Sequence, residues 1–225
     1  MIATFRLELR RNRGIVLWGS VVALVYGGVI AGFYPTIREN SALIEEYMAV
    51  FPKGFMAAFG MEGSLADPGV FFNTYVGSWL WPILAAVAGI IMATRPVAAD
   101  LDRGFLELPI STRLSRVRYL AVAISGQIIA MAIIAAATVG GVFLVGRMVD
   151  APFDGSRFAL AGLLAFGLGC PIAAVTTLLS VATLSRGMAG GIAGGVVIAM
   201  YLLQVVSTIR TDLGGLARLS IFDHF

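Results

Sequence analysis

The feature that most constrains this chain is a set of five long apolar runs that contain no Asp, Glu, Lys, Arg or His. A helix of about 20 mostly apolar residues is long enough to cross the hydrocarbon core of a bilayer. Each run is continuous rather than alternating, which favours helices over the strands of a membrane barrel. The sequence predicts an all-α polytopic membrane protein, one transmembrane domain over residues 1–225, with spans at 14–34, 71–94, 119–146, 158–184 and 188–208.

Composition agrees with a membrane protein. Hydrophobic residues make up 59% of the chain and charged residues 13%. Soluble domains contain about 45–50% apolar and about 25% charged residues. The net charge of +3 is explained by arginines beside anionic lipid headgroups, so no nucleic-acid partner is expected.

Two further segments are predicted to lie at the membrane surfaces. Residues 1–13 place Arg6, Arg10 and Arg13 on one helical stripe, which predicts an N-terminal amphipathic helix in the interface that turns into the first span. Residues 35–70 form an outer segment with phenylalanines at every fourth position from 51 to 59. This spacing predicts short amphipathic helices on the outer leaflet, the second starting at Pro52.

The distribution of arginines predicts the orientation, because Lys and Arg near span ends are retained in the cytoplasm. With the N-terminus inside, the inner segments hold ten of the 16 basic residues. The outer segments then hold nine of the 13 acidic residues. We therefore expect a multi-pass protein of the inner cell membrane with a cytoplasmic N-terminus, and a cytoplasmic loop at 95–118.

Several chemistries are disfavoured by what the sequence lacks. The one histidine is His224, so neither a Ser–His or Cys–His pair within the spans nor an HExxH zinc helix can be assembled. The one lysine, Lys53, lies in FPKGF and not in a phosphate-binding loop. We expect no enzyme activity and no cofactor or metal in this chain. The uncharged spans also disfavour an ion-coupled secondary carrier.

Small residues at four-residue spacing allow helices to approach closely in lipid. Such spacing occurs on the first span at Gly28 and Gly32, and on the fifth at Gly187, Gly191 and Gly195. Either packing within one subunit or a dimer interface would explain these glycines.

The densest charge lies in the loop between spans two and three, DLDRGFLELPISTRLSRVRYL. Alternating charge with a few apolar residues suits a loop that binds a soluble partner. Its sequence, Asp102 to Leu108 followed by Ser115-Arg116, resembles the first cytoplasmic loop of the membrane subunits of type-2 ATP-binding-cassette transporters, the class of drug and polysaccharide exporters. It departs from the usual pattern of that family at Asp102, Phe105 and Arg113.

The resemblance implies a function and its partners. In that family the loop forms a coupling helix that docks on a separate cytoplasmic ATPase subunit, which carries ATP and magnesium, and two membrane subunits assemble together. The docking residues that it implies here are Asp100, Asp102, Arg103, Gly104, Phe105, Leu106 and Glu107. The family has six spans, so we expect a further span after residue 225. The alternative is a non-transporting membrane scaffold that recruits a cytoplasmic partner through the same loop.

Overall fold

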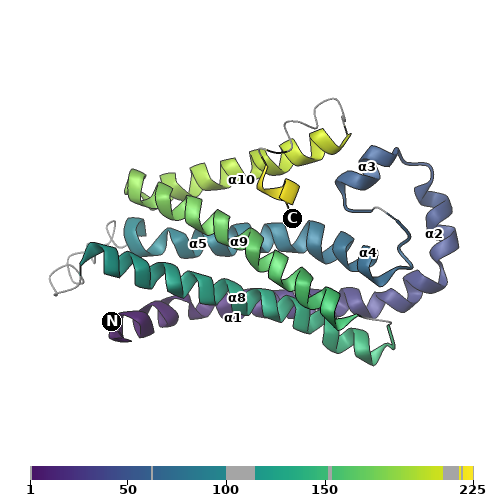
Figure 1. Ribbon diagram of the computed structural model, residues 1–225, viewed down its shortest axis with the longest axis horizontal. Helices are drawn as coiled ribbons and strands as arrows, with labels where there is room; N and C mark the ends of the chain where they lie inside the picture. The colour runs from purple at the N-terminus through teal and green to yellow at the C-terminus, as the bar shows by residue number, and fades with distance from the viewer. Residues whose placement is uncertain are drawn as a thin grey trace.

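The computed structural model describes residues 2–61, 63–99, 115–151, 154–209, 218 and 220–224. These residues are helical over most of their length, with no strand among them, and the long helices lie roughly along one axis (Figure 1). Five helical stretches are long and apolar enough to cross a membrane. They are Phe5–Glu39, Pro68–Ala98, Val117–Met148, Gly155–Thr183 and Arg186–Ile209. The predicted all-α polytopic membrane fold with five spans is confirmed.

The first span belongs to one helix, α1, which runs from Ile2 to Glu39 without a break. We expected residues 1–13 to form a separate helix that turns into the span, and the structure differs on this point. No proline stands before Pro35, and Gly14 has open space around it, so nothing forces the chain to turn. Contact with a second helix also extends down to Glu8, because a Cβ on Gly126 would lie 3.4 Å from that of Glu8.

The segment between the first two spans contains the short helices expected there, α2 (Ser41–Met48) and α3 (Lys53–Ala58), and Pro52 immediately precedes α3. The phenylalanine stripe forms a continuous row of rings: Phe51 stacks on Phe55 at 5.6 Å, Phe55 contacts Phe59 at 4.8 Å, and Phe59 stacks on Trp79 at 5.5 Å between centroids. The row therefore attaches α3 to the second span.

The second span is built from several pieces. It comprises α4 (Pro68–Phe72), a π-helix η1 (Asn73–Leu80), α5 (Trp81–Ala93) and a second π-helical turn η2 (Arg95–Ala99). Asp67 caps the start, its carboxylate accepting from the Gly69 amide at 2.6 Å. Because π-helical turns are rare and frequently occur at functional sites, η1 and η2 make this span a candidate for function.

The remaining long helices are α8 (Arg116–Met148), α9 (Gly155–Thr183) and α10 (Arg186–Ile209), followed by a 3-10 turn, η4 (Ile221–His224). Side chains cap the N-termini of α8 and α9: the Ser115 hydroxyl accepts from the Arg118 amide, and the Asp154 carboxylate accepts from the Ser156 amide. The α9 helix ends where Leu184 adopts a left-handed φ of 52°. Of the five spans, α10 is the least covered by other helices: 11% of its apolar stretch is buried.

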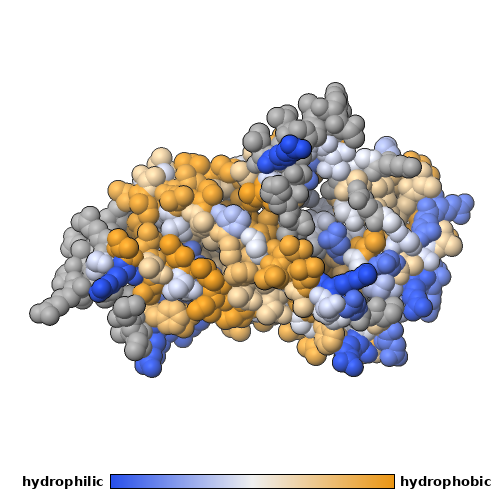
Figure 2. Space-filling model, viewed as in Figure 1, coloured by the Kyte–Doolittle hydropathy of each residue, from blue (hydrophilic) through white to orange (hydrophobic). Residues whose placement is uncertain are grey.

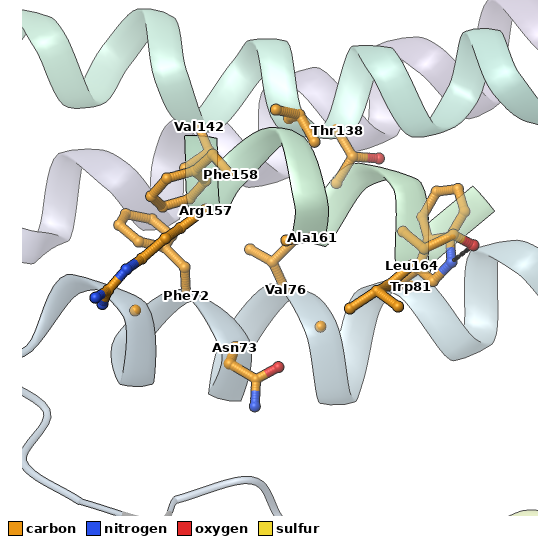
Figure 3. Close-up of a pocket in the computed structure, with 14 residues that line it drawn as sticks. Phe72, Asn73, Val76, Trp81, Thr138, Val142, Arg157, Phe158, Ala161 and Leu164 are labelled. Atoms are coloured by element: carbon orange, nitrogen blue, oxygen red, sulfur yellow. Dashed lines mark hydrogen bonds between the residues drawn. The ribbon is translucent and has the colours of Figure 1, made fainter. Parts of the chain in front are cut away.

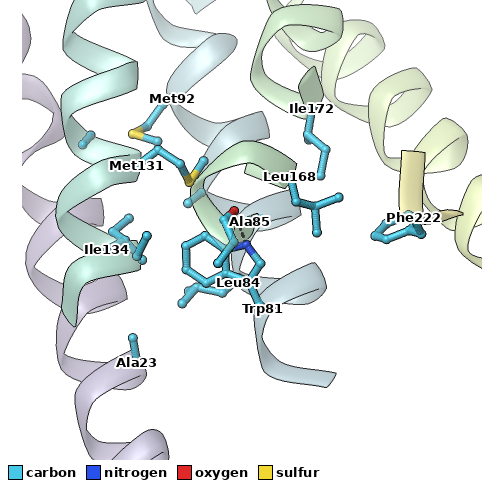
Figure 4. Packing of buried hydrophobic residues seen from close by; sticks show 14 residues of the cluster. Ala23, Trp81, Leu84, Ala85, Met92, Met131, Ile134, Leu168, Ile172 and Phe222 are labelled. Carbon is cyan, nitrogen blue, oxygen red and sulfur yellow. Dashed lines mark hydrogen bonds between the residues drawn. The ribbon is translucent and has the colours of Figure 1, made fainter. Parts of the chain in front are cut away.

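The centre of the bundle is a cluster in which Trp81 occupies the middle (Figure 4). Its indole N–H donates to the Ala165 carbonyl of α9, and Met131 and Ile134 of α8 lie beside it. Satisfying this donor matters because a buried indole without a partner is costly. A second cluster at the C-terminal end of α1 contains Tyr34, whose hydroxyl donates to the Ala66 carbonyl at 2.6 Å.

The closest helix pair is α1 and α8, which share the most extensive contact and lie side by side (Figure 1). A Cβ at Gly141 would fall 2.5 Å from the Leu24 carbonyl oxygen, so the two backbones touch at this point. A Cβ at Gly27 would fall 3.2 Å from the Thr138 carbonyl oxygen. Glycines on both partners therefore allow the pair to close, as expected for helices in lipid.

The visible surface fits a bilayer. Hydrophobic residues cover the middle of the face in Figure 2, and strongly hydrophilic residues gather mainly toward the two ends of the long axis. Exposed apolar side chains run along every span, including Leu17, Ile83, Ile133, Leu163 and Ile198. In water such a surface would be unfavourable, whereas in lipid it is the expected one.

Candidate functional site

The candidate site is the charged loop and the two segments that hold it. The docking residues Asp100, Asp102, Arg103, Gly104, Phe105, Leu106 and Glu107 lie outside the described residues. What the structure describes are the loop's two stems, residues 95–99 of η2 and residues 115–118 at the start of α8. Both stems lie at the same end of the bundle as the N-terminus (Figure 1).

The first stem is hydrogen-bonded to α1 in both directions. The Arg95 guanidinium donates to the Arg11 carbonyl at 2.7 Å and to Asn12 Oδ1 at 3.3 Å. In return, the Arg11 guanidinium donates to the Arg95 carbonyl at 3.1 Å. Arg11 also forms an ion pair with Glu8 at 3.1 Å. We call Glu8, Arg11, Asn12 and Arg95 the Arg95 cluster.

The Arg95 cluster is largely enclosed by protein. Glu8 and Asn12 are each 2% exposed, although both lie in the first four turns of the chain. A buried carboxylate and amide must be paired to be tolerated, and charge-assisted hydrogen bonds are the stronger kind. The cluster therefore fixes the position of η2 against α1.

The same stem is also bonded to α9. The Ala98 amide donates to the Ser180 hydroxyl at 3.2 Å, and both residues are fully buried. A buried backbone N–H needs an acceptor, and the Ser180 hydroxyl on the neighbouring helix supplies one for Ala98. Through Arg95 and Ala98, one short stem is joined to the first and fourth spans.

A polar pair lies deeper in the bundle, between α8 and α9. The Thr177 hydroxyl donates to the Ala173 carbonyl at 2.8 Å and lies 3.4 Å from Gln127 Oε1. A hydroxyl has one proton, so its remaining role toward Gln127 is as an acceptor. The amide orientation with nitrogen facing Thr177 then satisfies both groups better than the reverse.

The predicted glycine contacts divide into two kinds. Gly28 packs against α8, where a Cβ would meet Val145 Cγ2 at 3.1 Å. Gly32, Gly187, Gly191 and Gly195 have no described atom within 4 Å of that position. On α10 it is Gly190 and Gly194 that face Ile90 of α5, at 3.6 and 4.0 Å. Packing within the described chain therefore explains the glycine at position 28. For the other four glycines, a role in a dimer interface stays a prediction.

We expect Gly191→Leu to cause no loss of thermal stability in the monomer, because no described atom lies within 4 Å of the Cβ position and the site faces open space. If α10 is an intersubunit contact, the same change reduces the crosslinked dimer in membranes, since it blocks close helix approach. Gly167→Leu on α9 is the matched control, because its Cβ position is equally open and it is not among the predicted dimer glycines. Equal dimer yields for wild type and both variants would remove α10 from the interface.

Hollows lie between the spans of the described part of the chain, and two of them are large enough to note. One of about 210 Å³ separates η1 from α8 and the first half of α9, with Arg157 toward one end and Trp81 toward the other (Figure 3). A groove of about 560 Å³ lies between α5 and α10 and is lined almost entirely by apolar side chains such as Ile83, Val87 and Ile198. Within the described ranges no three His, Cys, Asp or Glu side chains are grouped as metal ligands.

Sequence reasoning missed the Arg95 cluster and Gly141. Placing the first span at residue 14 left Glu8 outside the bundle, whereas the continuous helix carries it into the protein interior. The Gly140-Gly141 pair was a usable signal of close packing in lipid. Comparison of the chain with family models, curated proteins and solved structures gives no match.

Proposed function

We propose that this chain is the membrane-spanning subunit of an ATP-driven transporter of the exporter type. In this proposal it lies in the inner cell membrane with the N-terminus in the cytoplasm and pairs with a second membrane subunit. The loop at 95–118 docks on a separate ATPase subunit, which supplies ATP and magnesium. The spans form the path for the substrate.

The observation that carries this proposal is the way the charged loop is held. Its sequence motif is of a kind that binds a soluble partner, and its first stem is bonded to α1 through Arg95 and to α9 through Ala98. A loop that only marked the inner side of the membrane would need no such bonds. The absence of a phosphate-binding loop in the sequence is consistent with energy from another subunit.

Within the loop, the chemistry assigns different roles to different residues. Phe105 and Leu106 are apolar residues of the type that anchors interfaces, whereas Asp102 and Glu107 would pair with basic groups at the rim. Gly104 permits a sharp bend or a close approach of the partner backbone. The anchors should therefore contribute more to affinity than either carboxylate.

We expect the double change Phe105→Ala/Leu106→Ala to weaken ATPase binding by about 2 kcal/mol, roughly thirtyfold, because buried apolar anchors dominate interface energy. The measurement is pull-down from membranes of a P-loop ATPase encoded by a neighbouring gene and co-expressed with this chain. Neutralising Glu107 should cost about 1 kcal/mol or less.

The matched control is Leu43→Ala/Tyr47→Ala, which deletes similar atoms from side chains that are 55% and 69% exposed on α2. This control should leave ATPase retention and expression unchanged. Full retention by the loop double variant would contradict the proposal and leave a loop that only obeys the positive-inside rule. Binding without substrate-stimulated ATP hydrolysis would instead favour the scaffold.

A further inference from the structure

The first turns of α1 carry a surface that the proposed function does not use. Arg6, Arg10 and Arg13 are all exposed, and none of their side chains forms a hydrogen bond or ion pair with the described residues. Successive residues of an α-helix are rotated by about 100°, so these three lie within about 60° of one another. They form a single cationic stripe.

The cationic stripe continues directly into the lipid-facing stripe of the same helix. Leu17 and Leu24 fall within the same arc and are 59% and 45% exposed. Because α1 does not turn after residue 13, the arginines point in the same direction as these leucines and not back toward the bundle. Trp18, 67% exposed, stands at the change from cationic to apolar, where aromatic side chains anchor helices at the membrane surface.

The acidic residue of this segment is turned away from the stripe. Glu8 is the sole carboxylate before Glu39 in the sequence, and it is buried and paired with Arg11. The exposed side of the helix from Arg6 to Arg13 therefore has three positive charges and no negative one to neutralise them. Along the axis it covers about 10 Å, comparable with the headgroup layer, which adds about 5–8 Å to each side of the hydrocarbon core.

We propose that Arg6, Arg10 and Arg13 form a binding site for the phosphate groups of anionic phospholipids. The acyl chains of the bound lipids lie along Leu17 and Leu24, and the guanidinium groups contact the phosphates above them. Guanidinium groups suit this role because they present several donors to a phosphate and stay charged. The site is independent of any ATPase partner and does not depend on which side of the membrane the N-terminus occupies.

The test counts bound lipids on the whole chain purified with an equimolar mixture of phosphatidylglycerol and phosphatidylcholine, by native mass spectrometry. The wild type should retain phosphatidylglycerol preferentially. The triple variant Arg6→Gln/Arg10→Gln/Arg13→Gln should lose most of that preference, with roughly a tenfold or greater drop in anionic-lipid affinity, since each basic residue near a surface contributes about fivefold. The corresponding triple lysine variant should keep much of it.

The control is Arg38→Gln/Arg147→Gln/Arg157→Gln, which removes three exposed arginines from the opposite end of the bundle. It has the same net charge as the test variant and should retain the wild-type lipid preference. A thermal melt of each variant checks that the fold is intact. Equal loss in both triple glutamine variants would mean a general charge effect, and no loss in the test variant would mean no site; either result overturns the proposal.

Discussion

Replacing Gly141 by alanine is expected to destabilise the protein, whereas the same change at the adjacent Gly140 is expected to be tolerated. At Gly141 the added carbon would lie 2.5, 2.7 and 3.0 Å from the carbonyl oxygen, Cα and carbonyl carbon of Leu24. These are backbone atoms, so the contact cannot be relieved by a side-chain rotation and α1 must move away from α8. Overpacking of this kind costs about 1–3 kcal/mol.

Gly140 is the internal control because no described atom lies within 4 Å of its Cβ position. Alanine has a higher helix propensity than glycine, so Gly140→Ala should be neutral or slightly stabilising. The measurement is the thermal midpoint of each variant in the same detergent, followed by the loss of the monodisperse peak in size-exclusion chromatography. Identical midpoints for Gly141→Ala and the wild type would contradict the direct backbone contact.

The second large effect is expected at Arg95. Changing it to methionine keeps an unbranched chain but removes the donors to the Arg11 carbonyl and to Asn12 Oδ1. Asn12 is 2% exposed and cannot turn to water for a replacement. Leaving a buried acceptor unsatisfied costs about 1–3 kcal/mol, so the variant should melt earlier than the wild type.

The location of the Arg95 effect separates it from a general loss of stability. Hydrogen exchange should become faster at the Ala98 amide, which donates to Ser180, because the stem is released from α1. Arg118→Met is the control, since Arg118 is exposed on the second stem of the same loop. If Arg95→Met and Arg118→Met exchange alike over residues 95–99, the Arg95 cluster does not hold the stem.

The sequence was sufficient for those features that depend on local pattern and solvent. The five spans follow from apolar length, and α3 follows from the proline at 52 and the phenylalanine spacing. The break expected between residues 13 and 14 does not occur, because local amphipathicity does not reveal that α8 extends alongside Glu8. Which helices contact each other, and at which residues, depends on tertiary packing and cannot be predicted from local sequence patterns.

The candidate site shows the same division. Charge pattern and motif drew attention to the loop, but the bonds of its stem join residues 84 positions apart in the sequence, Arg11 and Arg95. Nothing in the local sequence, RRNR for Arg11 and TRPV for Arg95, indicates that either side chain points into the protein. The glycine ladder of α10 was recognised, yet its spacing alone could not tell the face directed at Ile90 from the open one.

The close pairing of α1 with α8 limits how the loop can move the molecule. One stem is bonded to α1, and the other is the beginning of α8, which touches α1 backbone to backbone at Gly141. Both stems of the loop are thus attached to the α1–α8 pair, so a force on the loop cannot move the two stems apart. Force applied to the loop would reach α1 and α8 together, and α9 through the Ala98–Ser180 hydrogen bond, whereas α10 is the span least held by the rest of the described chain.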